Sequence, residues 1–75
     1  MNLSPRSIAF IEENVLPKLG FESITIDNLQ DIVDFISDNF EIPLAQAKEN
    51  GEVIDEKLLE LAASVITEIT TNPDW

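Results

Sequence analysis

The chain has 75 residues, 44% of them hydrophobic, and its 15 acidic residues outnumber its 4 basic residues to give a formal net charge of −11. That charge repels nucleic acid and anionic membranes, so we expect neither as a direct partner and expect any partner bound by charge to be basic. With no Cys and no His, the chain lacks disulfides, soft metal ligands and the commonest general base, which argues against the usual metal sites and most enzyme classes.

The first predicted helix covers about residues 5–16. Ser4 followed by Pro5 is typical of an N-cap with proline in the first turn, and Pro17 should end or kink the helix. Phe10 lies off the apolar face of this helix, so we expect it either to be covered by another helix or to be exposed as an oligomer contact. The apolar face itself recurs at helical spacing: Ile8, Ile11, Val15 and Leu19.

The second predicted helix covers about residues 26–41 and has the cleanest amphipathic pattern in the chain. Thr25, or alternatively Asp27, is the expected N-cap, and the helix should close before Pro43 because the residue before a proline is pushed out of helical geometry. Its inward residues follow in i, i+3, i+4, i+7 and i+11 order: Leu29, Ile32, Val33, Ile36 and Phe40.

A short helix over about 43–50 and a final helix over about 55–71 complete the predicted all-α bundle of three longer helices and one short helix. Gly51 should take a left-handed conformation after the short helix, and Asp55 should cap the final one. Trp75 could fold back onto the core. The final helix has a wide apolar arc, which predicts a central position: Leu58, Leu59, Leu61, Ala62, Val65, Ile66 and Ile69.

Five carboxylates of the second helix lie within about 40° of one line when each residue turns by about 100°. We call this set the acidic stripe: Asp27, Asp31, Asp34, Asp38 and Glu41. Its like-charge pairs cost about 1–2 kcal/mol in total at low salt. Two interpretations remain open, a solvated face or a docking surface for a basic partner, and in the second Phe35 on the flank of the stripe would add an apolar contact.

We therefore predict a non-enzymatic protein-interaction module or small regulator, formed by a single domain over residues 1–75 without metal or cofactor. A homo-oligomer joined through Phe10 or Phe35 is the alternative, since so short a chain buries little surface alone. A nucleic-acid mimic, whose carboxylates would take the place of phosphates, is a further alternative function. No apolar stretch is long enough to span a bilayer and no signal peptide pattern opens the chain, so we expect a cytoplasmic protein.

The segment "DNLQDIVDFISDNFEIP", residues 27–43, resembles the acidic second helix of acyl carrier proteins, which ends near an Ile-Pro pair. In that family a serine at the start of this helix bears the phosphopantetheine arm. The matching position here is Asn28, which has no hydroxyl to modify, and the connection from the first helix is shorter than the family's. The resemblance covers 17 of 75 residues and implies that a basic partner can recognise an acidic helix.

Overall fold

The computed structural model describes residues 3–71, and within them it contains helices and no strand, which confirms the predicted all-α class. Trp75 lies outside the described residues. No helix in residues 3–71 has both the length and the apolar character that crossing a bilayer requires. In chain order the elements are α1 (Pro5–Asn14), α2 (Leu16–Leu19), α3 (Leu29–Ile36), a π-helical segment η1 (Ser37–Glu41), α4 (Ile42–Glu49) and α5 (Glu56–Thr71).

Helix α1 begins as predicted, with the Ser4 hydroxyl accepting a hydrogen bond from the backbone N–H of Ser7 at 3.3 Å. It ends at Asn14, slightly earlier than expected, and α2 starts after a one-residue break with Pro17 in its first turn. Gly20 then ends α2 in the left-handed conformation, with φ of 76°. The predicted end or kink at Pro17 is therefore a break just before the proline, because its ring and missing N–H disrupt the preceding turn, and the short helix α2 follows.

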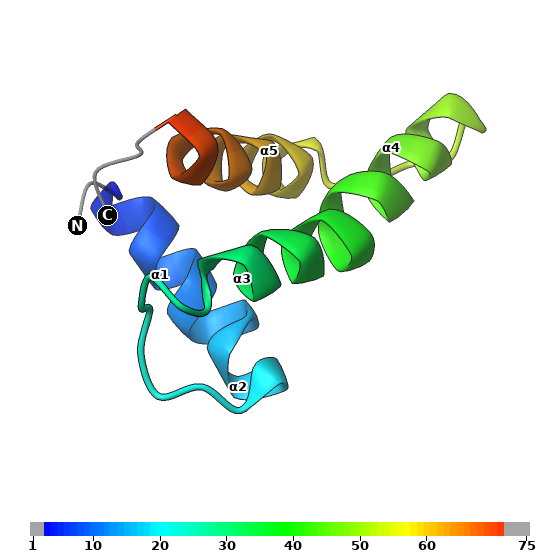
Figure 1. Ribbon diagram of the computed structural model, residues 1–75. Helices are drawn as coiled ribbons and strands as arrows, with labels where there is room; N and C mark the ends of the chain where they lie inside the picture. Colours follow the sequence, from blue (N-terminus) through cyan, green and yellow to red (C-terminus); the bar gives the residue numbers. More distant parts are fainter. Residues whose placement is uncertain (1–2, 72–75) are drawn as a thin grey trace.

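The predicted break before Pro43 is wrong, because α3, η1 and α4 form one continuous rod (Figure 1). Within a straight α-helix the ring of Pro43 would clash with the carbonyl group four residues earlier. The wider π turn of η1 relieves this conflict: the N–H of Ile42 donates to the carbonyl oxygen of Ser37, five residues back. The Asn39 side chain also donates to the Phe35 carbonyl oxygen at 2.9 Å, which gives the widened turn a further hydrogen bond.

The rod also begins later than predicted, at Leu29, and neither Thr25 nor Asp27 caps it. The side chain of Asn28 instead turns back into the preceding loop, where it is buried. Its Oδ1 accepts from the Thr25 N–H at 2.8 Å, and its Nδ2 donates to the Ser23 carbonyl oxygen at 2.8 Å. Asn28 therefore fixes the loop that leads into α3.

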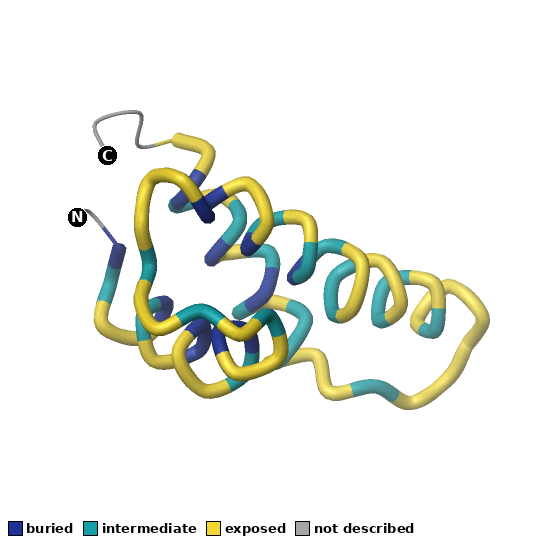
Figure 2. Tube along the Cα trace, turned by 60° about the horizontal axis from the view of Figure 1, so that its bottom comes forward, coloured by how far each residue is buried: buried dark blue, intermediate teal, exposed yellow. Residues whose placement is uncertain are grey.

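The core lies where α5 packs along α3 and η1 while α1 crosses near the start of α3 (Figure 1). Figure 2 shows the buried positions gathered in this part of the molecule. Of the five predicted inward residues of the second helix, Val33 and Phe40 are partly rather than fully buried. The apolar side chains with no exposed surface come from α1 and the residue that follows it, from α3 and from α5: Ile11, Val15, Ile32, Ile36, Ala62 and Val65.

Phe10 is a core residue with only 4% of its surface exposed, so the ring expected as a possible oligomer contact is not available to another chain in this fold. Its centroid lies 5.3 Å from that of Phe40 in an edge-to-face arrangement, a geometry that stabilises aromatic pairs. Phe35 is half-buried, and its centroid lies 6.3 Å from that of Phe40. The rod therefore covers the side of α1 that the helical pattern left unassigned.

Residues 42–55, which we call the arm, extend beyond the core (Figure 1). Helix α4 buries none of its residues, and 44% of Ile42 and all of Val53 are exposed. As predicted, Gly51 follows α4 with φ of 79°, and Asp55 caps α5, its Oδ1 accepting from the N–H of Leu58 at 3.2 Å. In Figure 2 the arm is exposed or half-buried along its whole length.

Replacing Pro43 should stabilise the protein. Pro43→Ala restores a backbone donor and removes the ring from a helix interior, so we expect the free energy of unfolding to rise by about 1–3 kcal/mol. Urea unfolding followed by far-UV circular dichroism measures the change. The matched control is Pro5→Ala, at a first-turn position where proline fits the helix. An unchanged or lowered stability for Pro43→Ala would show that η1 has another cause.

Candidate functional site

The structure places the acidic stripe on the outer side of the rod. Asp31 and Asp34 belong to α3, Asp38 belongs to η1, and Asp27 lies in the turn before α3. These four aspartates are exposed, as predicted, whereas Glu41 is half-buried. A π turn takes more residues than an α turn, so Glu41 is rotated away from the line that ideal helical spacing predicts.

The outward direction of the stripe follows from the opposite face of the same helix. Ile32 and Ile36 have 0% of their surface exposed, and Leu29 has 8%. Side chains three and four residues apart share one face of an α-helix, so these residues hold one face of α3 against the core. The aspartates between them consequently project into water from a rigid element.

No cation within the described chain neutralises the stripe. None of its five carboxylates has a Lys or Arg nitrogen within 4.0 Å, and Lys48 instead pairs with Glu56 at 3.1 Å. Within residues 3–71 the one side-chain hydrogen bond to the stripe comes from Gln30, whose Nε2 donates to Asp34 Oδ1 at 2.9 Å. In residues 3–71 no three carboxylates converge as ligands for a metal ion. The chemistry that this arrangement offers is attraction of cationic groups spread along a line.

Phe35 lies on α3 directly after Asp34 and three residues before Asp38, which puts a half-buried aromatic ring beside the exposed carboxylates. Its inner side faces Phe40. Large aromatic side chains next to a charged rim are typical of residues that contribute strongly to protein interfaces. Phe35 therefore remains a predicted contact for a partner that binds the stripe. Phe10 is buried and cannot contribute to the same surface.

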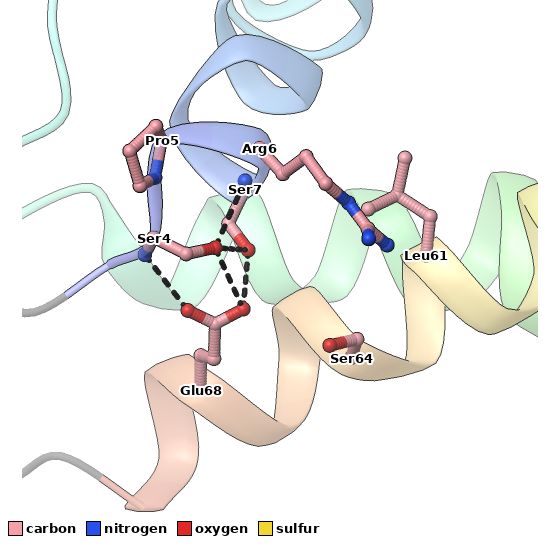
Figure 3. A pocket seen from close by; sticks show the side chains of 7 residues that line it. All are labelled: Ser4, Pro5, Arg6, Ser7, Leu61, Ser64 and Glu68. Carbon is pink, nitrogen blue, oxygen red and sulfur yellow. Dashed lines mark hydrogen bonds between the residues drawn. The ribbon is translucent and has the colours of Figure 1, made fainter.

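Apart from the acidic stripe, a set of hydrogen bonds from Ser4 and Ser7 to the carboxylate of Glu68 links the start of α1 to α5 (Figure 3). The Ser4 N–H donates to Glu68 Oε1 at 2.8 Å, and the Ser4 hydroxyl donates to Oε2 at 3.3 Å. The Ser7 hydroxyl, which is 1% exposed, donates to Oε2 as well. This bond lowers the pKa of Glu68 below its usual range, outweighing partial burial, and Ser4 and Arg6 act in the same direction.

Sequence reasoning found the Ser4 cap but missed its connection to Glu68. A signal was present, because Ser7 lies one turn before the buried Ile11 and Glu68 follows the buried Val65 by three residues. A polar residue beside the inward face of each of two helices indicates a hydrogen-bonded pair, since buried polar groups require partners. A carboxylate with a lowered pKa that already accepts several hydrogen bonds is a weak base, so this group serves to join two helices.

Glu68→Gln should destabilise the fold, because an amide has one acceptor oxygen for donors that now meet two. We expect a loss of about 1–3 kcal/mol in the free energy of unfolding at neutral pH. The pKa of Glu68 is lower in the folded than in the unfolded chain, so its contribution is present above the unfolded value and disappears as the pH falls through the folded one. The gap between wild type and variant should therefore begin to close near pH 4.5, the ordinary pKa of the group, and should disappear once the pH is below its lowered pKa in the folded chain.

Urea unfolding of both proteins across this pH range measures the gap. The matched control is Glu60→Gln, an exposed glutamate on the same helix, which should leave the stability unchanged within about 0.5 kcal/mol. A Glu68→Gln loss that stays constant down to acidic pH would contradict the assigned role of the ionised carboxylate.

Comparisons with protein-family models, with curated proteins and with solved structures found no match to this chain. The candidate site is therefore inferred from the exposure and charge of the surface residues alone. The carboxylate of Glu68 accepts hydrogen bonds from inside the chain, whereas the four exposed aspartates of the acidic stripe form no ion pair with any of the described residues. The acidic stripe is the candidate functional site.

Proposed function

We propose that this chain is a non-enzymatic protein-interaction module whose acidic stripe binds a basic surface of a partner protein. The observation that carries the proposal is the exposure of three aspartates on one helical rod and of a fourth, Asp27, in the turn before it, none of which forms an ion pair in the described chain. Repulsion along such an array destabilises the helix slightly, and a basic partner would remove that repulsion on binding.

Charge gives this proposed interaction its expected character. Exposed ion pairs contribute about 0.2–1 kcal/mol each, so the stripe should affect the association rate and the orientation of the partner more than the final affinity. At physiological ionic strength the field of exposed charges decays over about 8 Å. The proposal therefore predicts a complex that forms quickly at low salt and weakens as salt is added.

Charge reversal on the stripe should abolish capture of the partner. Asp34→Lys combined with Asp38→Lys leaves Asp31 in place, which lies in the first turn of α3 where a carboxylate stabilises the helix. The variant relieves like-charge repulsion, so its melting temperature should be equal or higher. The measurement is quantitative mass spectrometry of proteins captured from the source cells by wild type and variant.

The matched control separates position from net charge. Glu49→Lys combined with Glu52→Lys makes the same change of charge at two exposed residues of the arm. We expect this control to retain the basic partner that the stripe variant loses. Equal loss with both variants, or retention with both, would contradict recognition by the stripe.

Self-assembly through the arm is a second candidate function, favoured by the exposed apolar surface of Ile42 and Val53. Burying such a side chain contributes about 1.5–3 kcal/mol. Two copies would bury four of these side chains, against an association cost of about 4–15 kcal/mol. The balance favours a weak dimer at most, and the net charge of −11 on each copy opposes it further.

Sedimentation equilibrium tests this candidate at micromolar and submillimolar protein. We expect self-assembly to appear as a mass above the 8.4 kDa of one chain that rises with protein concentration and with added salt, which screens the repulsion. Ile42→Glu combined with Val53→Glu should return the mass to that of the monomer. A wild-type protein that stays monomeric at every concentration and salt level would contradict self-assembly.

A further inference from the structure

A small hollow lies between the first two helices and the loop that follows them, away from the acidic stripe's own helix. It has a volume of about 180 Å³. One wall comes from residues one turn apart along α1 and α2, and the other from the loop before α3. The lining residues are Ile8, Glu12, Leu16, Glu22, Ser23 and Ile24.

The charge of the hollow is negative and is not compensated from within the described chain. Glu12 on α1 and Glu22 on the loop are both exposed, and neither has a Lys or Arg nitrogen within 4.0 Å. The two carboxylates come from separate elements and line the same hollow. A cation in direct contact with these carboxylates would therefore come from outside the described chain.

The size and the remaining lining narrow the choice of ligand. Sites for cofactors and drug-sized molecules have volumes of about 300–1,000 Å³, so this hollow suits a single side chain. Ile8 and Ile24 are half-buried and Leu16 is 5% exposed, which gives an apolar wall beside the two carboxylates. Long cationic side chains match such a site, because their methylene stems pack on apolar surface while the charged end stays at the rim.

Of the two long cationic side chains, arginine suits a hollow lined by two carboxylates better than lysine does. Its planar guanidinium has five N–H donors and can bond to more than one carboxylate, and it is less strongly hydrated than the ammonium of lysine. We propose that this hollow binds one arginine side chain of a partner protein. The inference rests on the proposed function, because it names the anchor by which the basic partner of the acidic stripe is held.

The position of the hollow along the chain agrees with this role. Ile24 precedes Asp27, the first carboxylate of the acidic stripe, by three residues. Three residues of extended chain span at most about 11 Å. A basic segment with one arginine in the hollow can therefore reach the start of the stripe with its next few residues.

Binding of N-acetyl-arginine amide, followed by ¹⁵N–¹H correlation spectra, tests the arginine site directly. We expect saturable shifts at the amides of Ile8, Glu12, Ser23 and Ile24, with a dissociation constant in the millimolar range. N-acetyl-citrulline amide has nearly the same shape and no charge, and it should bind about threefold to tenfold more weakly. Equal binding of the two compounds would overturn the proposal.

Variants then assign the binding to the two glutamates. Glu12→Gln combined with Glu22→Gln should weaken arginine binding by about fivefold. The matched control, Glu13→Gln combined with Glu49→Gln, makes the same charge change at exposed residues outside the hollow and should retain binding. Equal weakening by both pairs, or shifts that map to the acidic stripe, would overturn the site.

The stripe variant Asp34→Lys combined with Asp38→Lys separates this inference from the proposed function. It should still bind N-acetyl-arginine amide at the hollow, because neither residue lines it. Loss of partner capture with retained arginine binding supports both ideas. Arginine binding without any loss of capture contradicts the stripe alone, and loss of capture without arginine binding contradicts the hollow alone.

Discussion

The packing of Ile32 and Ile36 into the core is the constraint on which the rest of the structure depends. Both side chains have 0% of their surface exposed, and they lie where α5 runs along the rod. Turning α3 by one residue would expose them at a cost of about 1.5–3 kcal/mol each, against a net stability of about 5–15 kcal/mol for a typical domain. The direction of every other side chain on α3, including the aspartates, follows from this burial.

The same packing explains how a proline is accommodated in the middle of the rod. Phe40 packs against Phe10 in the core, at a centroid distance of 5.3 Å. Pro43 requires a wider helical turn in the residues that precede it. The π segment meets both requirements, since it contains Phe40 and ends immediately before Ile42. As a consequence α4 continues outward instead of folding back, so none of its residues is fully buried and Val53 beyond it is exposed. The arm meets α5 at the surface through the ion pair of Lys48 with Glu56.

Helical periodicity predicted the class of fold, the inward face of α3, the cap at Asp55 and the exposure of the aspartates, because each depends on a few neighbouring residues. The features it missed depend on contacts between distant segments. Pro43 looked like a helix end because the stabilising contacts of Phe40 lie in another helix. The hollow was not foreseeable either, because it requires the loop at Glu22 to lie beside Glu12, and spacing along one helix carries no information about that loop.

A stripe of exposed carboxylates attracts many basic proteins, and exposed ion pairs discriminate poorly among them, since each contributes about 0.2–1 kcal/mol. Specific recognition requires a contact that depends on shape, where a wrong side chain leaves apolar surface or a charge without a partner. The proposed arginine site has that character, because the hollow combines an apolar wall with two glutamates, Glu12 and Glu22. If the proposed function holds, the net charge of −11 brings basic proteins of many kinds to the surface, and the fit of one arginine decides which of them stays bound.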